Sequence, residues 1–149
     1  HRYIRRQRQM CIRDREVPEK NQIKSKVVEE VVIEPILALL ATANLESGQK
    51  ISKKCVACHG FDAGGPNKVG PNLYNIVNKD QGKADYAYSK VLASLSGKWS
   101  YEELNKFLYK PKLYSKGTKM NYAGLSKTKD RANLIAWLRT KSDSPVSLP

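Results

Sequence analysis

Five consecutive residues constrain this chain more than any other feature: Cys55, Val56, Ala57, Cys58 and His59. On a helical turn, thiols three positions apart lie on the same side, and the next residue projects close to them. Two thiols can therefore reach the two vinyl groups of one porphyrin while the histidine lies under its iron. The C-x-x-C-H pattern is typical of covalent haem attachment.

Two other uses of such cysteines stay open at this point but are less favoured. A redox-active dithiol is expected within a βαβ pattern, and no strand is evident before Cys55. A structural zinc site needs four ligands, whereas residues 16–149 offer only Cys55, Cys58 and His59 as soft ligands. Covalent haem attachment therefore explains the motif best.

Met120 is the candidate for the second axial ligand of a haem iron. The only other histidine is His1, and the only other methionine is Met10. Met120 follows Lys116-Gly117-Thr118-Lys119, in a stretch without periodicity. A lone methionine more often fills a gap in a core, but this polar, glycine-containing context favours a ligand loop. We therefore expect iron ligation by His59 and Met120.

The chain divides into four regions of different composition. Residues 1–15 carry only arginine as their basic residue, and one back-translation of Met10 to Arg15 reproduces a transposon end used in sequencing-library preparation. We interpret this segment, with Cys11, as non-native. Residues 16–43 read as a linker to an upstream anchor that this chain does not contain, ending in a short segment that packs on the domain. Residues 44–141 form the domain, and residues 142–149 form a short tail.

The domain is expected to be all-α, with no convincing strand. Asn44 is a suitable N-cap for a helix over residues 44–55, and a short helix is expected over residues 88–95. Ser100 and Glu103 form a capping box before a helix that ends at Pro111. A further helix is predicted over residues 128–139, with Leu134, Ile135 and Leu138 on its buried side. Long loops are expected at 61–72 and 111–126, and long ordered loops in small domains are usually functional.

Charge is distributed unevenly along the chain, whose formal net charge is +13. Residues 1–15 carry +5, residues 16–43 carry −2, and residues 44–149 carry +10. A basic surface of this kind attracts nucleic acid, anionic lipid or an acidic protein, and charge alone does not choose among them. The longest apolar stretch, residues 27–43, is interrupted by three glutamates and a proline. We therefore expect neither a membrane span nor a signal peptide here.

Several motifs together resemble those of class I cytochromes c over about residues 44–140. They are CVACH, GPNLYNIV from Gly70, YAYS from Tyr86, Trp99, YKPKLYSKGTKM ending at Met120, NYAGL from Asn121, and RANLIAWLRT from Arg131. The likeness is strongest to the mitochondrial-like, membrane-tethered cytochromes of alphaproteobacteria. In that group an anchor and an acidic linker precede a segment like Glu34-Pro35-Ile36-Leu37. The resemblance implies the class I cytochrome c fold, in which a few short helices and long loops wrap round one covalently bound haem.

The resemblance also implies roles for individual residues. Pro71 would accept a hydrogen bond from the ring of His59 through its carbonyl oxygen, and Tyr88 and Trp99 would donate to a haem propionate. Thr118 would hydrogen-bond the haem or the Met120 loop, and Gly48 would permit close contact with the terminal helix near Trp137. Four positions depart from the family pattern, which puts loop rigidity and stability in doubt but not the ligands. They are Lys79 for an arginine, Phe107 for a tyrosine, Lys116 for a proline and Ser52 for an aromatic residue.

With histidine and methionine on the iron, no position remains for a substrate, so we expect electron transfer rather than an enzyme. The expected partners are acidic redox proteins, a quinol-cytochrome c reductase and a haem-copper terminal oxidase, with no nucleic acid. Lysines could steer them to the haem edge: Lys53, Lys54, Lys68, Lys112, Lys119 and Lys127. We expect a periplasmic monomer tethered to the outer face of the inner membrane. The alternatives are a dedicated haem acceptor for a periplasmic dehydrogenase, and a sensor or peroxidase-like protein in which Met120 dissociates.

Overall fold

The computed structural model describes residues 31–149, of which residues 32–149 form one unit. Residues 1–15, interpreted above as non-native, lie outside the described residues. So do residues 16–30, the larger part of the predicted linker. The elements are α1 (Leu37–Leu40), α2 (Leu45–Ser52), α3 (Lys90–Ala93), α4 (Tyr101–Tyr109), α5 (Pro111–Tyr114) and α6 (Thr128–Thr140). This part of the chain contains no strand, only one antiparallel bridge between Asp80 and Lys98. None of its helices is long and apolar enough to cross a membrane.

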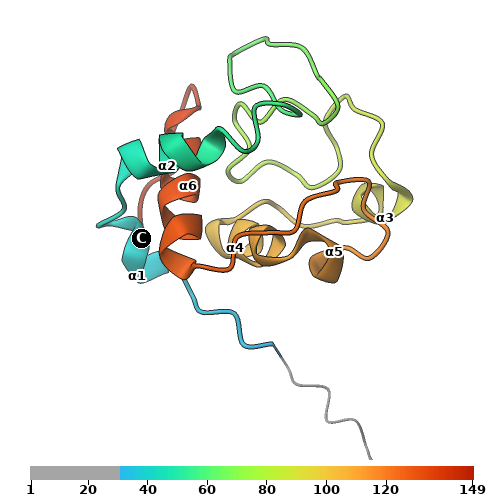
Figure 1. Ribbon diagram of the computed structural model, residues 1–149. Helices are drawn as coiled ribbons and strands as arrows, with labels where there is room; N and C mark the ends of the chain where they lie inside the picture. Colours follow the sequence, from blue (N-terminus) through green and yellow to red (C-terminus); the bar gives the residue numbers. More distant parts are fainter. Residues whose placement is uncertain (1–30) are drawn as a thin grey trace, which may run out of the picture. The chain divides into compact units, whose positions relative to one another are not determined.

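The crossing of α2 and α6 forms the centre of the helical packing (Figure 1). Gly48 permits it, because a Cβ at this position would lie 2.1 Å from the backbone oxygen of Asn133 and 2.7 Å from Trp137 Cβ. Asn44 caps α2 as predicted, its side chain accepting from Ser47 N at 2.8 Å. Its own backbone N–H donates to the Asn133 side chain at 2.9 Å. The cap therefore also fixes α2 against α6.

Helix α6 buries the three residues that the sequence placed on its inner side, Leu134, Ile135 and Leu138. Helix α4 packs against it and begins, as predicted, after Ser100, whose side chain accepts from Glu103 N at 3.3 Å. The other half of the capping box does not form. Ser100 N donates to Lys98 O instead, and the Glu103 carboxylate binds Tyr114 and Lys106.

Three expectations about local structure were wrong in detail. The stretch 111–126 is not all loop, because Pro111 ends α4 and also begins the one-turn helix α5, where a proline at the first position is well suited. The helix expected over residues 88–95 is shorter, covering Lys90–Ala93 with Ser89 as its N-cap. Helix α2 likewise ends at Ser52, and turns continue from there to Cys58.

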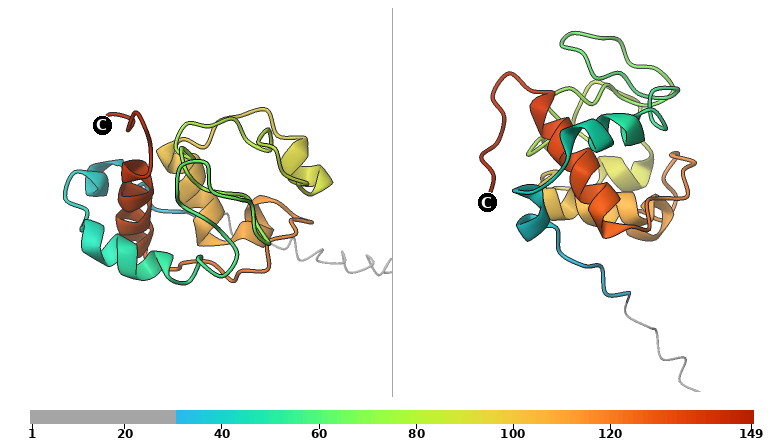
Figure 2. Two further views of the ribbon diagram at one scale, coloured as in Figure 1. Left: turned by 90° about the horizontal axis from the view of Figure 1, so that it is seen from above. Right: turned by 60° about the vertical axis from the view of Figure 1, so that its left-hand side comes forward.

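The segment just before α1 is fastened to the domain. The Glu102 side chain accepts from Ile36 N at 2.8 Å, and Asn105 donates to Glu34 O at 2.9 Å. Ile36 is fully buried and Leu40 nearly so. The packed chain thus begins about ten residues before Asn44, and the short packing segment predicted at the end of the linker is present. Figures 1 and 2 show α1 on one side of α6 and the loop of residues 60–89 on the other.

Candidate haem site

The turn after α2 carries the C-x-x-C-H motif. Cys58 N and His59 N both donate to Cys55 O, at 3.0 and 2.9 Å, which closes a helical turn. Cys55 is half-buried, Cys58 is exposed, and both are free thiols. Burial raises the pKa of Cys55, and the neighbouring Cys58 raises it further. Burial therefore favours the neutral thiol at Cys55, and both cysteines are free, as thioether formation requires.

His59 is held in one orientation. Its Nδ1 lies 2.7 Å from Pro71 O, and because a carbonyl only accepts, Nδ1 carries the proton and Nε2 presents a lone pair. The ring is buried, and burial lowers its pKa, which favours the neutral form. Gly70 lies against it, since a Cβ there would be 2.4 Å from Cε1. The contact implied for Pro71 is present, and it leaves one nitrogen free to bind a metal.

Met120 lies in the loop between α5 and α6, half-buried against the core. Its backbone N–H donates to Thr118 Oγ1 at 3.3 Å, so Thr118 stabilises the Met120 loop. The pKa of Tyr122 is raised by burial and by the nearby Cys55 thiol. Tyr122, two residues after Met120, therefore lies near Cys55, although the two are far apart in sequence.

Trp99 and Tyr88 keep unused donors. Trp99 is buried and packs edge-on against Phe107, with ring centroids 5.0 Å apart. Tyr88 is half-buried beside Tyr86, and burial raises the pKa of its hydroxyl. Within residues 31–149, neither the Trp99 indole N–H nor the Tyr88 hydroxyl donates to a protein group. Donation to a propionate stays a prediction for both.

The four positions that depart from the family pattern each have a local environment. Ser52 is buried and donates to Gln49 O at 2.7 Å. Phe107 is buried within an aromatic cluster, and Lys116 is exposed. Lys79 is half-buried, and its carbonyl accepts from Trp99 N at 2.8 Å. The backbone of Lys79 is thus hydrogen-bonded to Trp99, a predicted site residue. This bond does not depend on the Lys79 side chain.

Sequence reasoning missed some residues that shape the site. The Asn72 side chain donates to Asp62 O and Gly65 O, at 2.9 and 2.8 Å, and so holds the 61–72 loop together. Asn72 belongs to the GPNLYNIV motif noted in the sequence. Its partners are backbone oxygens, which no sequence pattern identifies. Gln81 carried no sequence signal, and Tyr114 lies in the YKPKLYSKGTKM motif but was given no role of its own.

Comparisons with known proteins agree with this geometry. The sequence model of the family described as "Cytochrome c" matches residues 45–142. The chain belongs to the cytochrome c family. It is 44% identical over 118 residues to a cytochrome c homolog of Bradyrhizobium diazoefficiens, covering 78% of this chain and 64% of that protein. A cytochrome c homolog of Rickettsia felis is 41% identical over 125 residues, covering 83% and 71%. The chain therefore spans about two thirds of these relatives.

A solved structure shares the fold. Cytochrome cH from Methylobacterium extorquens matches with a TM-score of 0.63 and 35% identity, covering 66% of this chain and all of that one. The fold is therefore the all-α class I cytochrome c fold, as predicted. Members of the family bind covalently attached haem c and are electron carriers rather than enzymes.

The residues present fit that cofactor. Two reduced thiols and a neutral, oriented histidine follow one another on one turn. A methionine loop lies close to this turn, and two donors without protein acceptors are available. Cys55 and Cys58 would hold the porphyrin, and His59 and Met120 would bind its iron. Pro71, Tyr88, Trp99 and Thr118 would support them.

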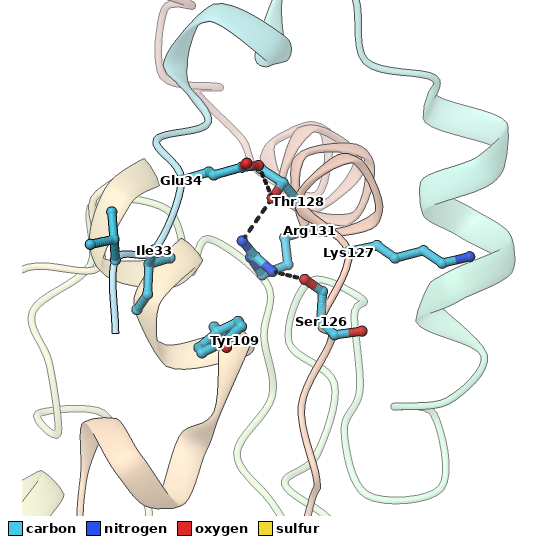
Figure 3. Close-up of a pocket in the computed structure, with 8 residues that line it drawn as sticks. Ile33, Glu34, Tyr109, Ser126, Lys127, Thr128 and Arg131 are labelled. Atoms are coloured by element: carbon cyan, nitrogen blue, oxygen red, sulfur yellow. Dashed lines mark hydrogen bonds between the residues drawn. The ribbon is translucent and has the colours of Figure 1, made fainter. Parts of the chain in front are cut away.

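Two surface pockets lie outside this set of residues. One, of about 310 Å³, is lined by residues 32–34, Tyr109, residues 126–128 and Arg131 (Figure 3). Arg131 is almost fully buried there and donates to Ser126 O and Thr128 Oγ1. The other, of about 440 Å³, follows the loops around Asn72 and Asp85. The first is the place where the segment before α1 enters the domain.

Proposed function

We propose that the protein is a one-electron carrier of a respiratory chain. It would take electrons from a quinol-oxidising complex and pass them to a haem-copper terminal oxidase. The observation that carries this proposal is the arrangement of His59, whose Nδ1 is fixed by Pro71 while its Nε2 stays free beside two reduced cysteines. Bound haem c supplies a reversible one-electron couple, and histidine and methionine ligation raises its potential.

The chain's own residues account for the rest of the mechanism. Cys55 and Cys58 would hold the cofactor, and Pro71 keeps the His59 ring in an orientation that leaves Nε2 free to bind its iron. Thr118 holds the backbone of Met120. With His59 and Met120 as the two residues that would bind the iron, the site would offer no place for a substrate. This arrangement favours electron transfer over the sensor or peroxidase-like alternative.

The lysines proposed to steer the partners are available to do so. All six are exposed: Lys53, Lys54, Lys68, Lys112, Lys119 and Lys127. None of them forms an ion pair with an acidic residue of the described chain. Lys68 and Lys119 instead donate to backbone oxygens of Val56 and Ala87, at 3.0 and 2.9 Å. Positive charge is therefore held close to the haem-binding turn, where an acidic partner would approach.

We further propose a periplasmic, membrane-tethered form. The resemblance to tethered alphaproteobacterial cytochromes supports it, and so does the docking of Glu34 and Ile36 on α4. Figures 1 and 2 show that α1, which follows this docked segment, lies on the side of α6 away from the 60–89 loop. A tether arriving there would leave the loop side free for partners.

The test is carried out on the full chain, matured in a host that attaches haem c. The mass of the product should exceed that of the polypeptide by one haem. Stopped-flow oxidation by a haem-copper oxidase should slow as ionic strength rises, and Lys68→Gln should slow it at low salt. The control is Lys50→Gln, because Lys50 is exposed on α2 and paired with Glu46. Rates indifferent to salt and to Lys68 would favour the dehydrogenase acceptor instead.

A further inference from the structure

Two short segments run side by side before α4. Asn78 N donates to Trp99 O and Trp99 N donates to Lys79 O, both at 2.8 Å. Gln81 N donates to Gly97 O at 2.9 Å, and Lys98 forms an exposed ion pair with Asp80. We call residues 78–81 and 97–99 the ladder. It holds Trp99, whose indole N–H is one of the unused donors of the site.

A chain of side-chain hydrogen bonds ties the ladder to α4 and α5. Gln81 is almost fully buried, and its Nε2 donates to the Tyr114 hydroxyl at 2.8 Å. Tyr114 in turn donates to the Glu103 carboxylate, which also accepts from Lys106 at 2.9 Å. The Tyr114 hydroxyl thus has a fixed donor on one side and a fixed acceptor on the other. It joins three segments distant in sequence.

The ring of Tyr114 also contacts the aromatic cluster around Trp99. Its centroid lies 5.9 Å from that of Trp99 and 5.6 Å from that of Phe107. Burial and the bond to Glu103 raise the pKa of Tyr114 to about 12, so the hydroxyl keeps its proton at physiological pH. The Tyr114 ring thus packs near Trp99, and its hydroxyl binds Gln81. Both contacts are with the ladder.

We propose that Tyr114 is a positioning residue for the haem site, which keeps the ladder and Trp99 closed over the cofactor through Gln81 and Glu103. The inference rests on the proposed function, because the closed ladder matters through the potential of the bound haem. We call the hydrogen bonds from Gln81 to Tyr114 and from Tyr114 to Glu103 the latch. When these bonds are lost, the ladder opens more often and water reaches the site. Burial of a haem raises its reduction potential, so a more open site has a lower one.

The experiment compares holoprotein variants that keep the aromatic ring. Tyr114→Phe removes only the hydroxyl and leaves Gln81 and Glu103 without their partner. We expect exchange of the Gln81 and Trp99 amide protons to become roughly tenfold faster, the factor for one lost buried hydrogen bond, and the midpoint potential to fall. The matched control is Tyr74→Phe, because the Tyr74 hydroxyl also donates to a carboxylate, that of Asp143, but does not touch the ladder. It should change neither quantity.

Two further variants separate the latch from a general loss of stability. Glu103→Gln keeps an acceptor oxygen for Tyr114 and should preserve slow exchange and the potential. Gln81→Ala should also speed amide exchange and lower the midpoint potential. It therefore tests the latch even if Tyr114→Phe fails to fold. Wild-type exchange and potential in haem-loaded Tyr114→Phe or Gln81→Ala would overturn the inference, as would equal changes in Tyr74→Phe. Absence of the haem mass increment in the wild type would instead refute the proposed function.

Discussion

The two halves of this domain differ in how their polar groups are satisfied. In the helical half, α1, α2, α4 and α6, Arg131 is 1% exposed yet donates to the side chains of Asn105 in α4 and Thr128 in α6. The loop half, residues 53–99 and 110–127, leaves groups without protein partners. Among them are the Trp99 indole N–H and His59 Nε2, and Ser115 Oγ is buried without any partner. The buried arginine of the helical half thus has protein partners, whereas the loop half leaves groups that a bound haem would meet.

Preventing haem attachment should have the largest effect on the difference between the two halves. In a Cys55→Ala/Cys58→Ala double variant we expect no haem mass increment. We also expect loss of amide protection across the loop half, because its bonds, such as Gly70 N to Cys58 O, lie beside the residues that would hold the cofactor. Amides of α6 should keep more protection than those of the loops. Hydrogen exchange followed by mass spectrometry measures both.

The control for that prediction is the wild-type chain made without the haem-attachment machinery. It should match the double variant, since both lack the cofactor. Equal protection of the two halves in these samples would show that the helical half also depends on haem.

Gly48→Ala should produce the next largest effect, this time in the helical half. The added methyl group would lie 2.1 Å from Asn133 O, a backbone atom that cannot move aside without shifting α6. We expect a loss of about 3 kcal/mol in the free energy of unfolding, at the upper end of overpacking costs. Urea denaturation of the holoprotein measures it. Gly64→Ala is the comparison, because nothing lies within 4 Å of that Cβ, although its φ of +67° adds a backbone cost of its own. A smaller loss at Gly48 than at Gly64 would contradict the close crossing.

The docked segment before α1 tests how far the helical half extends. Glu102→Ala removes the acceptor of Ile36 N, a backbone group of a fully buried residue. We expect a loss of about 1–3 kcal/mol, the usual cost of leaving such a group unpaired, and faster cleavage of residues 32–43 by proteases. Glu46→Ala is the control, since its exposed pair with Lys50 contributes about 0.3–0.5 kcal/mol. If both variants behave alike, the segment is not part of the folded domain.

The same division explains what could be predicted from the sequence. The helices were found because capping residues and buried spacing act locally, as Asn44, Ser100 and Leu134 show. The turn that carries Cys55 and His59 was found because its chemistry needs adjacent residues. Long-range polar contacts, such as Gln81 to Tyr114 or Asn105 to Glu34, carry no periodic signal. They depend on how distant segments meet, and the half-formed capping box at Glu103 shows such a contact overriding a local rule.

Asn78 offers a smaller test, confined to the ladder of the loop half. Its φ of +63° lies in the left-handed region, where asparagine and glycine are tolerated. Asn78→Ala should cost about 1 kcal/mol, while Asn78→Gly should be nearly neutral. Both free energies come from urea denaturation. If alanine and glycine prove equally stable, the left-handed backbone at this position is wrong.

The smallest expected effect concerns acid. The hydrogen bond from Tyr114 lowers the pKa of Glu103, and the nearby Lys106 lowers it further. A carboxylate with a depressed folded-state pKa contributes stability above its unfolded pKa, and this contribution disappears as the pH falls through the folded value. Between about pH 6 and pH 3, the urea midpoint of the wild type should therefore decline slightly more than that of Glu103→Gln, which cannot titrate. Because the Glu103 carboxylate of α4 is joined to the ladder through Tyr114, identical pH profiles would mean that the two halves are not coupled through its charge.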